Sequence, residues 1–191
     1  KLGATQTRIY FMRSEAKLKT GDADGAKEDR NIGLSITPSD ELSWVARGVQ
    51  QLKTDPDASL SDFQQALEIN PRSISALRNC VHVLADRLGE LEEALVHVEG
   101  LLSINPDDTD AIAGKAVLLA RLKDRQGSLS AIERLLKLTN EPKALFQAAC
   151  ALSITSESEP DDATTSLAYL SRAILKEQEW IFRARTAPDL E

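Results

Sequence analysis

Apolar residues recur at spacings of three and four along most of this 191-residue chain, in runs separated by short polar segments. One pair of runs contains Leu42, Val45, Val49 and Leu52, followed by Leu60, Phe63, Ala66, Leu67 and Ile69. This spacing places the apolar side chains on one face of an α-helix. The pattern therefore predicts an all-α protein built from pairs of amphipathic helices.

The helix pairs repeat with a nearly constant period, which is marked by related segments around four prolines. SITPSDE, EINPRSI, SINPDDT and LTNEPKA contain Pro38, Pro71, Pro106 and Pro142, at spacings of 33, 35 and 36 residues. Each proline ends a helix, and a polar residue after it can cap the next helix. Candidate caps are Asp40, Ser73 and Asp108. A period of about 34 residues indicates a helical solenoid.

Residues at fixed positions of each unit resemble the tetratricopeptide repeat, in which small residues let two helices approach closely. The clearest unit supplies Trp44, Gly48, Ser59, Phe63 and Ala66. Matching residues elsewhere are Tyr10, Ser14 and Ala26; Leu77, Ala94 and Val98; Ile112, Ala116, Ala131, Leu135 and Leu138; and Phe146, Cys150, Ser166, Leu170 and Ala173. The unit that begins near Ile74 has one extra residue in its turn.

The resemblance implies one right-handed superhelical solenoid domain over residues 1–191. Its five units are expected at 7–40, 41–73, 74–108, 109–142 and 143–178, followed by a capping helix at 179–191. In such units Trp44 has a core position, and Trp180 is expected to seal the last apolar face. Because the chain begins with Lys1 rather than Met, it is interpreted as a fragment of a longer protein.

The C-terminal segment carries a second resemblance. FRARTAPDLE, after KEQEWI, is similar to the end of the tetratricopeptide regions that follow planctomycete-type bacterial serine/threonine kinase domains. This similarity implies a kinase domain upstream in the parent protein. The chain itself has no Gly-rich phosphate loop, HRD or DFG motif.

Composition narrows the classes of partner. A net charge of −7 argues against a sequence-independent nucleic-acid binder, which needs a basic face, and against a polybasic membrane-surface protein. The two cysteines, Cys80 and Cys150, lie within helical patterns and suit a reducing compartment, so a cytoplasmic location is expected. Both are expected to be small core residues.

Few residues have the spacing that catalysis or metal binding requires. GDADGAKED, from Gly21 to Asp29, resembles half of a calcium loop but lacks acidic ligands at the first and last positions, so Asp22 and Asp24 are interpreted as helix-capping residues. His82 has no ligand partner at zinc spacing, and Cys80 points to a different side of the helix. The sequence therefore predicts no enzyme, no cofactor and no metal. The polar insert at 155–164 is longer than the other turns, and its role is left open.

The resemblance places a binding groove along the first helix of each unit. The residues expected to line it are Phe11, Glu15, Lys19, Val45, Val49, Arg78, His82, Asp86, Val117 and Arg121. An acidic peptide or helix of a partner protein would place apolar anchors on the valines and carboxylates on the arginines. Three alternatives stay open: an ordinary solvated surface, docking within the parent protein, and self-association.

Overall fold

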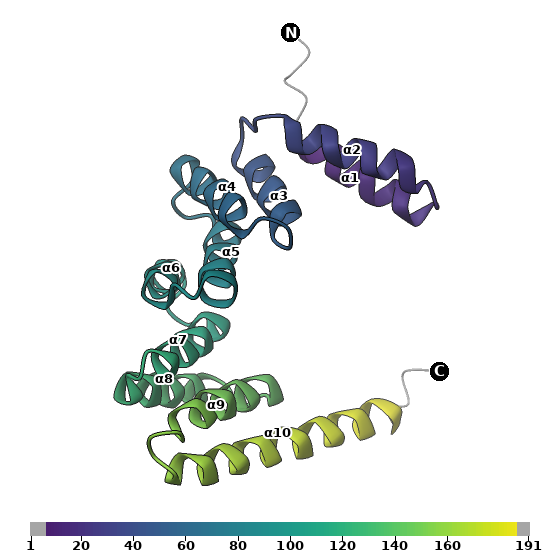
Figure 1. Cartoon of the computed structure of the whole chain (residues 1–191). Helices are drawn as coiled ribbons and strands as arrows, with labels where there is room; N and C mark the ends of the chain where they lie inside the picture. Colours follow the sequence, from purple (N-terminus) through teal and green to yellow (C-terminus); the bar gives the residue numbers. More distant parts are fainter. Residues whose placement is uncertain (1–6, 187–191) are drawn as a thin grey trace. The chain divides into compact units, whose positions relative to one another are not determined.

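The computed structural model describes the backbone of residues 7–186 and the side chains of residues 7–178, and this part of the chain contains helices and no strand (Figure 1). The chain divides into two compact units between Leu101 and Leu102. The first contains α1 (Thr7–Lys19), α2 (Ala23–Ser35), α3 (Glu41–Gln51), α4 (Pro56–Ile69), α5 (Ile74–Val83), the π-helical turn η1 (Leu84–Leu88) and most of α6 (Leu91–Ile104). The second contains α7 (Thr109–Arg121), α8 (Arg125–Leu138), α9 (Pro142–Thr155) and α10 (Asp161–Thr186).

The helices begin where the sequence predicts caps. Asp40 accepts a hydrogen bond from the Ser43 amide at 3.0 Å, and Asp108 accepts one from the Ala111 amide at 3.1 Å. Asp22 caps α2 by accepting from the Gly25 amide at 2.9 Å. Each bond satisfies an amide that the first helical turn leaves without a partner. The interpretation of Asp22 as a capping residue is therefore confirmed.

A serine joins the two helices of four pairs by donating its hydroxyl to a backbone carbonyl of the facing helix. Ser59 bonds to Gly48 at 2.8 Å, Ser128 to Ala116 at 2.9 Å, and Ser166 to Ala149 at 2.7 Å, each from the second helix to the first. In α1 and α2 the direction is reversed, with Ser14 bonding to Ala26 at 2.7 Å. These serines give a common register for comparing the pairs.

Phe11 is a core residue, so its prediction as a groove residue is wrong. Its ring lies against Gly33, where an added Cβ atom would be 2.6 Å from Phe11 Cε1. The next pair has the same contact with the partners exchanged, because Gly48 of α3 lies against the ring of Phe63 of α4. Phe11 is buried because α2 offers a glycine opposite it.

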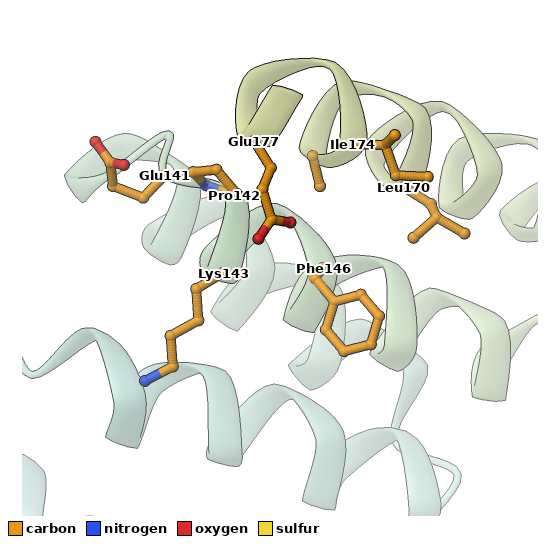
Figure 2. A pocket seen from close by; sticks show the side chains of 8 residues that line it. Glu141, Pro142, Lys143, Phe146, Leu170, Ile174 and Glu177 are labelled. Atoms are coloured by element: carbon orange, nitrogen blue, oxygen red, sulfur yellow. The ribbon is translucent and has the colours of Figure 1, made fainter. Parts of the chain in front are cut away.

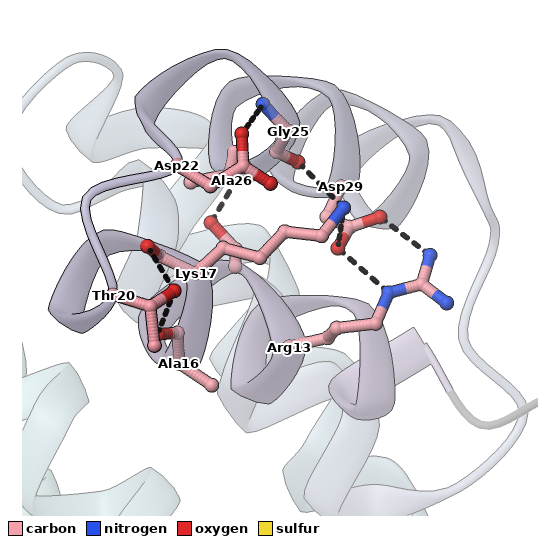
Figure 3. A network of polar contacts seen from close by, with 9 residues as sticks. Arg13, Ala16, Lys17, Thr20, Asp22, Gly25, Ala26 and Asp29 are labelled. Atoms are coloured by element: carbon pink, nitrogen blue, oxygen red, sulfur yellow. Dashed lines mark hydrogen bonds and ion pairs between the residues drawn. The ribbon is translucent and has the colours of Figure 1, made fainter.

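Bidentate ion pairs connect the first two helix pairs internally. Arg13 of α1 bonds to both carboxylate oxygens of Asp29 of α2 at 2.5 and 2.7 Å, and Lys17 approaches the same carboxylate at 3.0 Å (Figure 3). Arg47 and Asp62 repeat this geometry between α3 and α4 at 2.7 and 2.9 Å. The hydrogen bond from Arg13 is the main reason that the pKa of Asp29 falls from 3.8 to about 2.

The extra residue predicted in the third repeat lies in η1. This turn follows α5 directly, and Gly89 after it has a φ of 77°. A π-helical turn bonds residue i to i+5 and so contains one more residue than an α-helical turn. The helix pair therefore accommodates the insertion without a longer loop.

The end of the described chain differs from the expected separate capping helix at 179–191. α10 continues without a break from Asp161 to Thr186. The side chain of Trp180, predicted to seal the last face, lies outside the described side chains. At its other end α10 is fixed by Asp162, which accepts two hydrogen bonds from Arg125 of α8 at 2.8 Å and one from Thr155 at 2.7 Å.

Candidate functional site

Of the apolar residues expected to line the groove in the first unit, only Val49 is exposed. Phe11 and Val45 are both buried. Val45 lies in α3, which packs against α1, α4 and α5, so neighbouring helices cover the position that the repeat pattern assigns to the groove. The prediction that Phe11 and Val45 line the groove is therefore wrong.

The polar groove candidates of the first unit are exposed, and two pairs of them bind each other. Glu15 and Lys19 form an ion pair at 2.9 Å, and His82 Nδ1 lies 2.9 Å from Asp86 Oδ2. Arg78 is also exposed. In the second unit Arg121 is exposed and Val117 is half-buried. Arg78 belongs to the first unit, whereas Val117 and Arg121 belong to the second.

The fifth repeat follows a register one residue earlier than expected. Phe146 and Cys150 were assigned to core positions, but Phe146 is 52% exposed and Cys150 is half-buried. Leu145 and Ala149 are buried instead, and Ser166 bonds to the carbonyl of Ala149. This shift turns an aromatic side chain outward on α9.

The exposed Phe146 forms part of an apolar cleft between α9 and α10, with a volume of about 520 Å³ (Figure 2). Its lining residues are Glu141, Pro142, Lys143 and Phe146 of α9 and its start, and Leu170, Ala173, Ile174 and Glu177 of α10. Lys143 forms an ion pair with Asp110 of α7 at 2.6 Å. Glu141 and Glu177 are exposed, and the side chain of Glu177 points from α10 toward α9 (Figure 2). The cleft thus combines apolar side chains with two acidic ones.

The equivalent face of the preceding helix pair is partly covered by the next pair. Counted from the pair's serine, Leu129, Ile132 and Leu136 of α8 have the same offsets as Leu167, Leu170 and Ile174 of α10. The three residues of α8 line a cavity of about 320 Å³ with Leu152 of α9 and Tyr169 of α10, and Ile132 is buried. On α10, Leu167 is 64% exposed and Ile174 is 49% exposed. Among the described residues, no further helix covers this face of α10.

Residues with catalytic side chains do not form a reactive group in the described structure. Burial raises the pKa of the Cys80 thiol to about 12, so this cysteine is not an activated nucleophile. Burial also lowers the pKa of His97. Within the described residues, no cluster of three histidine, cysteine or acidic side chains has the geometry of a metal site.

Trp44 differs from its predicted core role. It is half-buried, and the guanidinium of Arg47 lies 4.7 Å from the centre of its ring. Arg47 is held there by its bonds to Asp62, so the tryptophan covers an ion pair rather than filling the space between helices. Phe63 fills that space, as the repeat pattern predicts.

No protein-family model and no curated protein sequence matches this chain. Solved structures do match it. The structure of MamA from residue 41 to the end, from Desulfovibrio magneticus RS-1, superposes with a TM-score of 0.69 at 16% identity, covering 92% of this chain and 97% of the MamA chain in that structure. A tetratricopeptide repeat protein from Parabacteroides merdae gives 0.68 at 20% identity, covering 86% of this chain and 65% of its own. This chain has the tetratricopeptide fold.

A third tetratricopeptide structure, YrrB, is described as having an unusual peptide-binding site. It superposes with a TM-score of 0.57 at 21% identity, covering 68% of this chain and 67% of YrrB. These likenesses establish the arrangement of helices. The predicted link to kinase-associated repeats has no counterpart in the three structures and stays a prediction.

The cleft was missed at the level of sequence because the resemblance assigned Phe146 to the core. The signal that identifies it is the spacing to the paired serine: the small residue across from Ser166 is Ala149, and Leu145 lies four residues before it. Leu167 and Ile174 were also overlooked, although their offsets from Ser166 repeat those of α8.

Proposed function

We propose that this protein is a non-catalytic interaction module that binds an amphipathic helix of a protein partner in the cleft between α9 and α10. The observation that carries the proposal is the pair of equivalent faces on α8 and α10. The α8 face receives a helix of the next repeat, whereas the same face of α10, with Phe146 beside it, is exposed. A surface built to contact a helix therefore faces solvent.

The lining of the cleft defines the chemistry of the ligand. Phe146, Leu170 and Ile174 would contact apolar side chains spaced three or four residues apart, the usual pattern of a helix in a groove. Glu141 and Glu177 favour basic residues on either side of that apolar stripe. This ligand differs from the acidic peptide expected from Arg78 and Arg121. Tetratricopeptide neighbours, one described as peptide-binding, support an interaction role.

A library of displayed helical peptides, selected on the immobilised full chain, tests this proposal. Selected peptides should share an apolar stripe flanked by lysine or arginine, and fluorescence anisotropy should show weaker binding to Phe146→Glu by tenfold or more, about 1.4 kcal/mol. Val96→Glu, which changes another exposed apolar side chain, on α6, is the matched control and should bind normally. Selected peptides that bind Phe146→Glu as tightly as the unmodified chain would refute the site.

No membrane-spanning helix is found in the described part of the chain, since none there is both long and apolar enough. We also propose, from the sequence, that the protein is cytoplasmic, that it binds no nucleic acid, and that a kinase domain precedes it in the parent protein.

A further inference from the structure

We infer that Asp110 of α7 sets the charge preference of the cleft by holding the ammonium group of Lys143 away from the two glutamates. This inference rests on the proposed function, because it assigns a specificity-determining residue to the same site. Asp110 is not one of the residues that line the cleft, so it acts through Lys143 as a positioning residue.

Lys143 is the one basic side chain among the described residues that line the cleft. Its Nζ atom lies 2.6 Å from Oδ1 of Asp110, on a different helix. In Figure 2 the side chain of Lys143 points away from the carboxylate of Glu177. The ion pair therefore keeps the only positive charge of the lining directed out of the cleft.

Lys143 occupies a position in α9 where a positive charge is unfavourable. It follows Pro142, the first residue of the helix, and the first turn of α9 contains no acidic residue. The amides of a first turn have no partner within the helix and attract negative charge. Without Asp110, the lysine and the helix terminus would both add positive charge to this end of the cleft. Asp110 offsets that charge from outside the helix.

The two glutamates of the cleft can bind a ligand directly. Within the described part of the chain, neither Glu141 nor Glu177 has an ion pair or a hydrogen bond to its carboxylate, and both are exposed. Two carboxylates and one ammonium group give the lining a formal charge of −1, which becomes −2 once Asp110 is counted with Lys143. Basic residues of a helical ligand can then approach both glutamates.

Asp110 belongs to the preceding repeat, which separates it from the ligand. It lies in the first turn of α7, where its amide donates a hydrogen bond to the cap Asp108 at 3.1 Å. α7 packs against α9, and the ion pair joins the starts of the two helices. A substitution at residue 110 therefore releases Lys143 without removing a residue that lines the cleft.

The binding of two related peptides to the full chain tests the inference. The first peptide is the tightest binder from the selected helical library, and the second is a copy in which glutamates replace its flanking basic residues. The ratio of their dissociation constants, measured by fluorescence anisotropy at low salt, gives the charge preference. In Asp110→Asn the preference for the basic peptide should fall by about threefold or more, because the released lysine neutralises a glutamate. A purely structural role would weaken both peptides equally and leave the ratio unchanged.

Three further variants separate this effect from a general change of charge. Asp107→Asn removes the same charge three residues earlier, beside Arg134 of α8 rather than Lys143, and should keep the ratio. Asp110→Glu retains a carboxylate and should also keep it. In a Lys143→Met background, Asp110→Asn should change the ratio no more than Asp107→Asn does.

The outcomes distinguish this inference from the proposed function. An unchanged ratio in Asp110→Asn, or an equal fall in Asp107→Asn, overturns the inference and leaves the proposed function standing if peptides still bind through Phe146. Selected peptides that bind through Phe146 without basic residues also overturn it. If no selected peptide depends on Phe146, the proposed function fails and the inference fails with it.

Discussion

Replacing Gly48 with alanine tests a close contact between two helices, α3 and α4. In α3 an added Cβ atom at residue 48 would lie 2.6, 2.9 and 3.0 Å from three ring atoms of Phe63. Carbon atoms in favourable contact are about 3.5–4.0 Å apart, so the two helices must separate. Phe63 is fully buried.

Two opposing effects set the magnitude. Alanine in a helix interior is more stable than glycine by about 1 kcal/mol, whereas overpacking a core costs about 1–3 kcal/mol. Because the overlap involves a rigid ring, we expect the upper part of that range and a net destabilisation of about 1–2 kcal/mol. Gly114→Ala in α7 is the matched control, since nothing lies within 4 Å of its added Cβ. That substitution should stabilise the second unit by about 1 kcal/mol.

Urea unfolding followed by tryptophan fluorescence measures the effect locally. A Trp180→Phe background leaves Trp44, four residues before Gly48 in α3, as the single tryptophan. Far-ultraviolet circular dichroism follows the Gly114 control. Adding Phe63→Leu removes two of the three close ring atoms, so the double variant should be more stable than additivity predicts, by about 1 kcal/mol. A Gly48→Ala chain as stable as the parent, or strictly additive effects, would refute the reasoning.

Two further predictions concern a turn and an ion pair. Lys123, between α7 and α8, has a φ of 64°, which glycine adopts more easily, so Lys123→Gly should raise the free energy of unfolding in urea by about 0.5–1 kcal/mol. Gly21→Ala, at the matching turn between α1 and α2 (φ 86°), should lower it by about as much. A change in the same direction for both variants would contradict this reasoning. The pKa of Asp29 is lowered from 3.8 to about 2, so its contribution is present above pH 4 and lost as the pH falls toward 2. Asp29→Asn should therefore lose less stability between pH 4 and pH 2 than the unmodified chain does. If the urea midpoints of the two chains fall equally over this range, the ion pair of Asp29 with Arg13 does not cause the loss.

The period of prolines and apolar residues was sufficient to predict the helix pairs, since those features act within a single helix or turn. Caps such as Asp40 and Asp108 depend only on nearby amides and were predicted correctly. Phe11 was not, because its burial depends on Gly33 of the facing helix, 22 residues away. A position in a repeat pattern describes the average unit. In the first pair, Gly33 on α2 lets α1 supply the large side chain, whereas in the second pair Gly48 on α3 leaves that role to α4.

The register of the fifth repeat, which places Phe146 in the candidate site, could not be predicted from the sequence either. Leu145 and Phe146 are adjacent large apolar residues, and either could occupy the one core position of the repeat. The longer insert before α10 removes the regular spacing between helices that sets the register in the other units. The register is set by contacts between the helices, because Leu145 is buried four residues before Ala149, whose carbonyl accepts the hydrogen bond from Ser166. The exposed fraction of Phe146 follows from that choice, so the cleft required the three-dimensional structure.

The apolar character of the exposed face of α10 follows from the repeat. An internal repeat presents one face to the repeat after it, and on α8 this face includes Leu129 and Leu136. On α10, Leu167 and Ile174 have the same offsets from the paired serine and the same apolar character, and both are exposed. A glutamate at Ile174 changes this face alone, so it should weaken the binding of helical peptides in the cleft without changing the helix pairs. A loss of helical signal in circular dichroism would contradict this expectation.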